Sequence, residues 1–117
     1  MLRRLLQAVG LAKGLGPGGE KPSATRSPHW PAVRKIHLLK EPICQACGAE
    51  KSLEVHHIHP FHLFPALELT DSNLITLCEG DTVNCHFLYG HLRSWKSYNG
   101  MVRRDATEWL RKIKERP

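Results

Sequence analysis

The chain lacks a long uninterrupted run of apolar residues, and it lacks a plain secretory signal. A helix that crosses a bilayer needs roughly 18 or more apolar residues in a row, so we expect neither an integral membrane protein nor a membrane partner. The uncharged run near the N-terminus covers only residues 5–12, and no convincing small-residue cleavage site follows it. We therefore expect a protein that is not secreted. Because the start is rich in Arg and free of acidic residues, an organelle transit peptide stays open as the alternative.

The chain also lacks internal repeats, and its 117 residues leave room for one domain only. That length excludes a large doubly wound α/β enzyme built around a cofactor. The segment from Gly14 to Pro28 is rich in Gly, Pro, Ser and Thr, a composition that buries too little apolar surface to fold. We therefore predict a flexible basic tail over residues 1–28, a folded domain over residues 29–100 and a C-terminal helix over residues 101–117.

Positive charge is in excess, but it is unevenly distributed. Seventeen Lys and Arg residues against 11 Asp and Glu residues give a formal net charge of +6. Residues 1–30 carry a net charge of +4, residues 31–91 carry −3 and residues 92–117 carry +5. An acidic middle between two basic ends indicates that the ends contact a polyanion. The alternative is ordinary solvated surface charge.

Hydrophobic spacing predicts an α+β fold built from a few short elements. Pro31 suits a first helical turn, and Pro42 disfavours helix beyond Glu41. Apolar residues at positions 102, 106, 109, 110 and 113 follow helical offsets and predict a C-terminal amphipathic helix. The expected elements are a helix over residues 30–40, strands over residues 53–58 and 73–78, a loop over residues 60–72, a helix that begins at residue 85, and the C-terminal helix.

The four cysteines occur as two pairs, Cys44-x2-Cys47 and Cys78-x6-Cys85. A CxxC knuckle followed by a second pair is the spacing at which two loops close a tetrahedral thiolate site for zinc. A folded segment of this size seldom reaches stability through its core alone, and a structural Zn²⁺ would stabilise it strongly. We therefore predict one structural zinc ion. Two disulfides are the alternative, although a bridge between Cys44 and Cys47 would close a small, strained ring.

Six of the eight histidines lie between positions 56 and 91. Neighbouring residues of a strand point to opposite faces, so His56 and His57 cannot have the same role. One ring can turn toward a metal ion and the other toward whatever the ion holds. His86 begins a helix directly after the last cysteine, so a zinc site would hold that helix against the strand that carries His56. We expect the imidazoles of His56 and His86 to meet.

These residues resemble the HNH endonucleases, a family of the His-Me finger (ββα-metal) group. The three letters of the family name fall on His57, Asn73 and His86. The chain looks most similar to the phage and prophage branch, whose members often continue into a Gly-His and Trp-Lys stretch. The resemblance is carried by Cys44-Gln-Ala-Cys47-Gly48, Leu53-Glu-Val-His-His-Ile-His-Pro60, Ser72-Asn-Leu-Ile-Thr-Leu-Cys78, Asn84-Cys-His86, Gly90-His91 and Trp95-Lys96.

The resemblance implies a small zinc-stabilised ββα-metal domain that hydrolyses DNA phosphodiester bonds with one divalent ion. His57 would act as general base on the attacking water, which suits a group whose ordinary pKa is near 6.5. His56 and His86 would hold the ion, which would stabilise charge on the phosphate and on the leaving 3′ oxygen. Asn73 would brace the loop that aims His57. Imidazole ligands accept Mg²⁺, Mn²⁺, Ni²⁺ or Zn²⁺.

The same resemblance implies products with 5′-phosphate and 3′-hydroxyl ends, and a protein of the cytoplasm of a bacterial or phage-infected cell. His91 lies five residues after His86, about 140° round an ideal helix, so we expect it to contact either the metal ion or a phosphate. Basic residues near the C-terminus would bind the DNA backbone without sequence preference. The candidates are Arg93, Lys96, Arg103, Arg104 and Arg111.

Two further functions stay open. A non-catalytic zinc-knuckle module that binds nucleic acid needs only the four cysteines and the basic ends. A nuclease of a phage DNA-packaging machine, regulated by packaging proteins as partners, has the same residues as a free-standing enzyme. His57 and Asn73, at the positions that the family uses for hydrolysis, favour a nuclease over the binding module.

Overall fold

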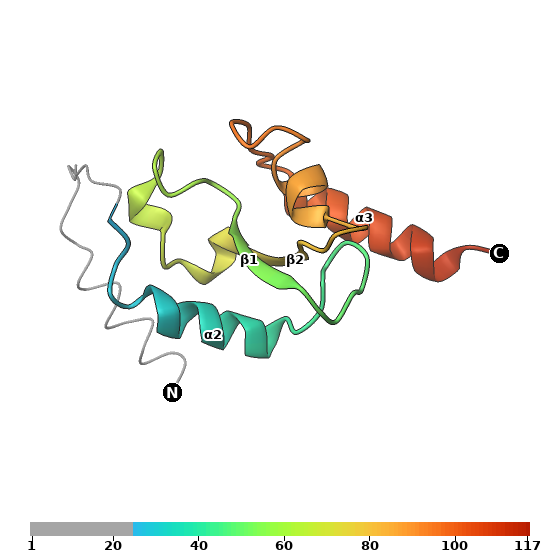
Figure 1. The fold of residues 1–117 in the computed structure, drawn as a ribbon, viewed down its shortest axis with the longest axis horizontal. Helices are drawn as coiled ribbons and strands as arrows, with labels where there is room; N and C mark the ends of the chain where they lie inside the picture. The colour runs from blue at the N-terminus through green and yellow to red at the C-terminus, as the bar shows by residue number, and fades with distance from the viewer. Residues whose placement is uncertain (1–24) are drawn as a thin grey trace.

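The computed structural model describes residues 25–117, which form an α+β fold as predicted (Figure 1). Helix α2 spans Trp30–Lys40, the same residues that the sequence predicts. Pro31 lies in its first turn, where its missing N–H costs nothing. The helix ends at Lys40. The next residue, Glu41, is its C-cap and donates its backbone N–H to the carbonyl of His37, and Pro42 follows.

The two predicted strands pair as a small antiparallel sheet. Strand β1 spans Leu53–His57 and strand β2 spans Leu74–Cys78. In the register of the pair, Leu53 lies opposite Cys78 and His57 lies opposite Leu74. The sheet therefore brings the end of β1, with its two histidines, to the start of β2.

The sheet has a hydrophobic cluster on each face. On one face, Val33 of α2 packs with Val55, Leu69 and Leu74. On the other face, Ile75 and Leu77 belong to a larger cluster with Val102 and Ala106 of the C-terminal helix. Figure 1 shows α2 and the C-terminal helix α3 on either side of the strands. Because successive strand residues alternate between these clusters, His56 and His57 point to different neighbours, as predicted.

The last two elements of the chain are helices of different types, one a π-helical turn and the other an α-helix. Helix α3 spans Val102–Glu115 and confirms the predicted amphipathic helix. The helix expected to begin at residue 85 is instead a single π-helical turn, η3, which spans His86–Gly90. The backbone N–H of His91 donates to the carbonyl of His86, five residues earlier. This wider turn changes where His91 lies.

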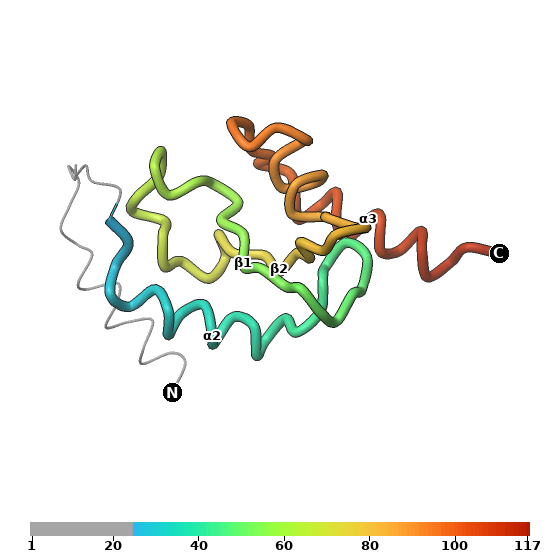
Figure 2. The backbone as a smooth tube through the Cα atoms, in the orientation of Figure 1, coloured from blue at the N-terminus to red at the C-terminus, as the bar shows by residue number. Residues whose placement is uncertain are grey.

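Two loops rise beside the sheet, as the tube in Figure 2 shows. The first follows β1 and contains two short 3-10 turns, η1 (Pro65–Leu67) and η2 (Asp71–Asn73), so the predicted loop over residues 60–72 is largely confirmed. The second joins η3 to α3. The two loops meet where the ring centroid of Tyr98 lies 5.8 Å from that of His59.

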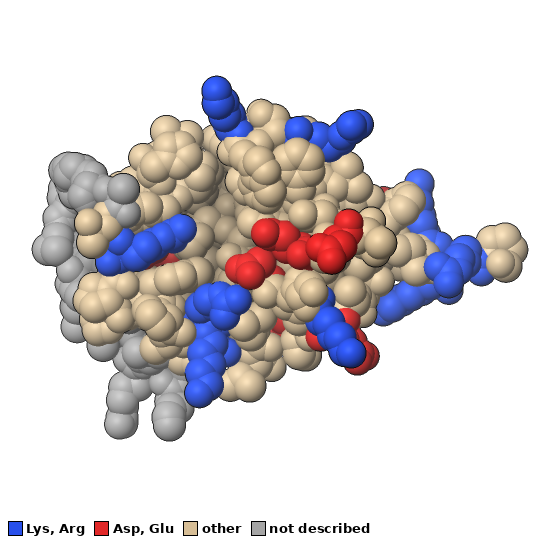
Figure 3. Space-filling model, viewed as in Figure 1, with Lys and Arg blue, Asp and Glu red and all other residues tan. Residues whose placement is uncertain are grey.

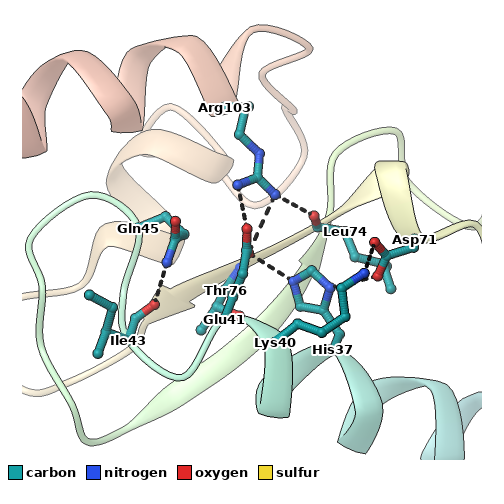
Figure 4. A network of polar contacts seen from close by, with 9 residues as sticks. All are labelled: His37, Lys40, Glu41, Ile43, Gln45, Asp71, Leu74, Thr76 and Arg103. Carbon is teal, nitrogen blue, oxygen red and sulfur yellow. Dashed lines mark hydrogen bonds and ion pairs between the residues drawn. The ribbon is translucent and has the colours of Figure 1, made fainter. Parts of the chain in front are cut away.

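A partly buried polar network joins α2, β2 and α3 (Figure 4). The carboxylate of Glu41 accepts hydrogen bonds from both terminal nitrogens of Arg103 and from the ring of His37. Arg103 also donates to the carbonyl of Leu74 at 2.9 Å. Burial alone would raise the pKa of Glu41, but the bonds from His37 and Arg103 outweigh it and lower that pKa to about 2. Arg103, which the sequence assigns to DNA contact, thus pairs with Glu41, while its side chain stays 42% exposed.

The predicted tail, residues 1–28, lies largely outside the described residues. Its last part packs on the domain, because the backbone N–H of Ser27 donates to both carboxylate oxygens of Glu68, at 3.0 and 3.3 Å. Within residues 25–117, no helix is both long enough and apolar enough to cross a membrane.

Candidate metal centre

The four cysteine sulfurs come together at one point, where the chain passes three times. Cys44 and Cys47 belong to the turn after α2, Cys78 ends β2, and Cys85 precedes η3. Their sulfur atoms all lie within 4.8 Å of one another. All four are free thiols, and the Sγ atoms of Cys47 and Cys78 are 3.7 Å apart, far longer than a disulfide bond of about 2 Å. The cluster can therefore hold a zinc ion.

The turn that carries the first two cysteines has the geometry of a metal knuckle. The backbone N–H of Cys47 donates to the sulfur of Cys44 at 3.4 Å, and that of Gly48 donates to the Cys44 carbonyl at 2.9 Å. Gly48 has a φ of 82°, in the left-handed region where a side chain costs energy. Because Cys78 and Cys85 flank a tight polar turn, the cluster fixes the start of η3 against the end of β2.

Three imidazoles form a second cluster on the face of the sheet that η3 covers. The ring centroid of His56 lies 4.8 Å from that of His86 and 4.9 Å from that of His91, and the last two rings are 4.9 Å apart. Their nitrogen donors lie within 4.8 Å of one another. The predicted meeting of His56 and His86 is confirmed. We refer to these three residues as the histidine triad.

Hydrogen bonds orient two rings of the histidine triad. Nδ1 of His86 lies 2.7 Å from a carboxylate oxygen of Glu79, and Nδ1 of His91 donates to the carbonyl of Ser97 at 2.8 Å. Both contacts leave Nε2 available for the cluster. Such second-layer partners fix the tautomer and the direction of metal-binding imidazoles. Neither Glu79 nor Ser97 is recognisable from the sequence, because each acts through a contact that spacing does not reveal.

The third ring of the histidine triad, His56, has a nitrogen atom that suits a metal ligand. Nε2 of His56 is buried, and it has no hydrogen-bond partner in the part of the chain that the structure describes. Buried polar atoms are nearly always paired, so an unpaired one that faces two other imidazoles fits a bound cation. Burial, followed by the neighbouring His86, His91 and His57, lowers the pKa of His56 to about 3. The ring is therefore neutral, which is the metal-binding form.

The π-helical turn explains how His91 joins the histidine triad. In an ideal α-helix, a residue five positions on lies about 140° away from the first. The i to i+5 hydrogen bond from His91 to His86 widens the turn by about one residue and brings the two rings to one side. Gly90 makes the approach feasible, since a Cβ there would lie 3.1 Å from the His56 ring.

His57 lies on the other face, beside α2. Its Nε2 is 2.8 Å from the carbonyl of Glu68, so Nε2 must donate and Nδ1 carries the lone pair. The ring is 8% exposed, and its centroid is 4.5 Å from that of Trp30. Burial lowers the pKa of His57 to about 4, against the opposing effect of the Glu68 carbonyl and with help from the charge of Arg26. Nδ1 lies 3.5 Å from Nη1 of Arg26, a residue that the sequence did not single out.

Asn73 holds the loop that follows β1. Its side-chain oxygen accepts from the backbone N–H of His59 at 2.9 Å, and its amide donates to the carbonyls of His59 and Leu67. The side chain is buried. It therefore bridges both ends of the segment that contains Glu68, the partner of His57.

The basic residues that the sequence assigns to DNA contact differ in exposure and in their ion-pair partners. Arg93, Lys96 and Arg104 are exposed, whereas Arg103 is held by Glu41. Arg111 forms ion pairs with Glu108 and Glu115 along α3. Figure 3 shows acidic side chains near the centre of one face, with Lys and Arg side chains around its margin, in agreement with the acidic middle and basic ends of the sequence.

Together, the fold and the two clusters define a small metal-binding α+β domain. Residues 44–90, less than half of the chain, match the model of the HNH endonuclease family, so the chain is similar to that family over this segment. The matched segment includes the four cysteines and residues 56, 57, 73 and 86, and it stops one residue before His91. No curated protein and no solved structure matches the chain. An HNH domain indicates a nuclease that binds metal and acts on nucleic acid.

Proposed function

We propose that the protein is a metal-dependent endonuclease that hydrolyses phosphodiester bonds of DNA. His57 is the general base, and the histidine triad holds one divalent cation. The observation that carries the proposal is the buried Nε2 of His56, which has no hydrogen-bond partner among residues 25–117 and faces His86 and His91 near the segment that matches the HNH family. We infer that the protein acts in the cytoplasm, where DNA lies.

The tautomer of His57 is fixed by its hydrogen bond to the carbonyl of Glu68. Because Nε2 of His57 donates to Glu68, the lone pair on Nδ1 can take a proton from a water molecule as that water attacks phosphorus. Asn73 ties both ends of the loop together and so fixes the direction of the Glu68 carbonyl. Asn73 is a positioning residue, since it acts on His57 through this loop.

The histidine triad has the composition of a catalytic cation site. A divalent cation held there would supply stabilisation of the negative charge that develops during hydrolysis of the phosphodiester. His56, His86 and His91 would hold it, while Glu79 and the Ser97 carbonyl keep two of these rings in register. Mg²⁺, Mn²⁺, Ni²⁺ and Zn²⁺ are the candidate ions. The products carry a 5′-phosphate and a 3′-hydroxyl group.

The four cysteines would hold a separate, structural Zn²⁺. Three protein ligands leave a coordination position open for substrate, whereas four thiolates close the coordination shell. The two clusters therefore suit different tasks: the cysteines join β2 to η3, and the histidine triad does chemistry. Exposed Arg93, Lys96 and Arg104 would contact phosphates of the DNA backbone.

The direct test incubates purified, zinc-loaded protein with supercoiled plasmid and each of the four divalent ions. We expect the wild type to nick or linearise the plasmid, and His57→Ala to lose at least about 10²-fold in rate, the range typical of a general base. His62→Ala, which removes an exposed imidazole, is the control and should cleave like the wild type.

Other outcomes of the plasmid experiment would favour one of the two alternative functions. Plasmid binding without cleavage in any of the four ions would favour the non-catalytic zinc-knuckle module. Cleavage only after phage packaging proteins are added would favour the partner-regulated nuclease. Equal rates for His57→Ala and the wild type would remove His57 as the base.

A further inference from the structure

The segment just before α2 places the guanidinium group of Arg26 beside His57, the proposed general base. Nη1 of Arg26 lies 3.5 Å from Nδ1 of His57, the atom that carries the lone pair. This separation is at the outer limit of a hydrogen bond, so the contact is weak and easily exchanged for a better one. Arg26 lies outside the segment that matches the HNH family.

Two independent contacts fix the position of Arg26. The next residue, Ser27, donates its backbone N–H to the buried carboxylate of Glu68, whose carbonyl in turn accepts from His57. The Arg26 guanidinium carbon lies 4.9 Å from the centroid of the Phe61 ring and 5.5 Å from that of Trp30. Cation–π contacts hold the flat faces of a guanidinium group and leave its N–H edges available.

Among residues 25–117, the charge of Arg26 has no anionic partner. Within residues 25–117, the side-chain contacts of its guanidinium are with His57, Phe61 and Trp30, and none of these is a carboxylate. The other arginines near the sheet, Arg34 and Arg103, each pair with a glutamate. Arg26 is therefore an exposed cation that is positioned by rings and is available to an anion.

The distance between Arg26 and His57 would place the phosphate that is attacked within reach of the guanidinium group. A water molecule that His57 deprotonates lies about 3 Å from Nδ1, and its oxygen lies about 3 Å from the phosphorus that it attacks. The non-bridging oxygens of that phosphate then lie within reach of a guanidinium group that is 3.5 Å from Nδ1. Planar guanidinium groups bind phosphate oxygens through paired N–H donors.

We propose that Arg26 binds the phosphate at the cleavage site, either the scissile phosphate or its immediate neighbour. This assignment rests on the proposed nuclease activity. It makes the segment before α2 part of the active site, although sequence composition assigns that segment to a linker.

Salt dependence of binding tests the assignment without relying on cleavage. Zinc-loaded protein, freed of other divalent ions, is titrated with a labelled DNA duplex between about 50 and 200 mM salt. Loss of one phosphate contact should reduce the slope of log affinity against log salt by about 0.9. We expect this reduction for Arg26→Ala. Lys35→Ala, which removes one exposed charge from α2, should leave the slope unchanged. Equal slopes for Arg26→Ala and the wild type would overturn the proposal, as would an equal reduction in both variants.

Cleavage kinetics give the second readout. Arg26→Ala should lower kcat/KM by about 10²-fold, the effect of removing one donor to a developing oxyanion. Arg26→Lys should recover part of that loss, and added guanidinium ion should raise the rate of Arg26→Ala but not of the wild type. Faster cleavage by Arg26→Ala would overturn the proposal, because it would show that the guanidinium only blocks the base. If the wild type cleaves no DNA, the nuclease proposal fails, and the salt slope still decides the role of Arg26.

Discussion

At the scale of single residues, Gly90 controls how closely the backbone of η3 approaches the histidine triad. A Cβ at this position would lie 3.1 Å from Cε1 and Nε2 of His56. That separation is shorter than ordinary carbon contacts, so the imidazole would have to shift by a few tenths of an ångström. His56 is buried in the sheet and has little room to move.

Gly90→Ala should therefore weaken divalent-ion binding at the histidine triad by about 10-fold or more, the range seen when partners of metal ligands are disturbed. Gly100→Ala is the matched control, because its Cβ would lie 3.5 Å from His59, an ordinary contact. Binding of Ni²⁺ to zinc-loaded protein, followed by calorimetry, measures both. Equal affinity of Gly90→Ala and Gly100→Ala would show that the approach of η3 to His56 does not matter.

At the scale of secondary-structure elements, His37 connects α2 to the start of β2 through two carboxylates. Its Nε2 lies 2.9 Å from Glu41 and its Nδ1 lies 3.0 Å from Asp71. A carboxylate cannot donate, so both ring nitrogens must carry protons and the ring must be charged. Burial alone would lower the pKa of His37, but the hydrogen bonds to Glu41 and Asp71 outweigh it and raise that pKa above 6.5.

The sign of the pH dependence follows from this shift. Because the folded-state pKa is raised, the charged ring stabilises the fold fully below pH 6.5, and the contribution is lost as pH rises through the folded-state value. One proton gives a slope of at most about 1.4 kcal/mol per pH unit. We expect the free energy of unfolding, measured with urea between pH 6 and 9, to show this loss in the wild type and less of it in Asp71→Asn. Unfolding also releases zinc, and the pH dependence of that release is the same in the wild type and in Asp71→Asn. Identical pH profiles for the two proteins would therefore contradict a charged His37.

Four of the secondary-structure elements could be predicted from the sequence, whereas the π-helical turn could not. Helix α2, both strands and α3 follow from apolar spacing and from Pro31 and Pro42, and all four form as predicted. The π-helical turn could not be predicted, because its hydrogen bond depends on how the histidine triad packs. For the same reason, helical geometry alone gave His91 an ambiguous role, since the 140° offset assumes an ideal α-helix.

At the scale of the whole molecule, chemistry depends on how distant segments are held together. The cysteine pairs and the adjacent histidines were visible in the sequence, because metal ligands have characteristic types and spacing. Arg26, Glu68 and Glu79 are not, because each contacts a histidine that is distant from it in the sequence. The charge of Arg103 predicts a DNA contact, and the sequence gives no sign that Arg103 also pairs with Glu41, 62 residues away in the chain. Charge patterns therefore indicate a class of substrate but do not identify which cations are available to bind it.

The cysteine cluster and the histidine triad both lie where the elements of the fold meet. A sheet of two five-residue strands is too small to be stable alone. Here α2 covers one face, while η3 and α3 cover the other, and the cysteine cluster joins the sheet to η3. The histidine triad lies between the elements that this cluster holds, so the structural site would support the catalytic one.

The most direct test of this account is a titration of zinc-loaded protein with Ni²⁺. We predict one further ion bound per chain in the wild type, with affinity reduced at least about 10-fold in His91→Ala and unchanged in His62→Ala. His91→Ala tests the contribution of the π-helical turn, since that turn alone brings residue 91 to the other two rings. A wild type that binds no further ion, or a His91→Ala variant that binds it equally well, would contradict the account.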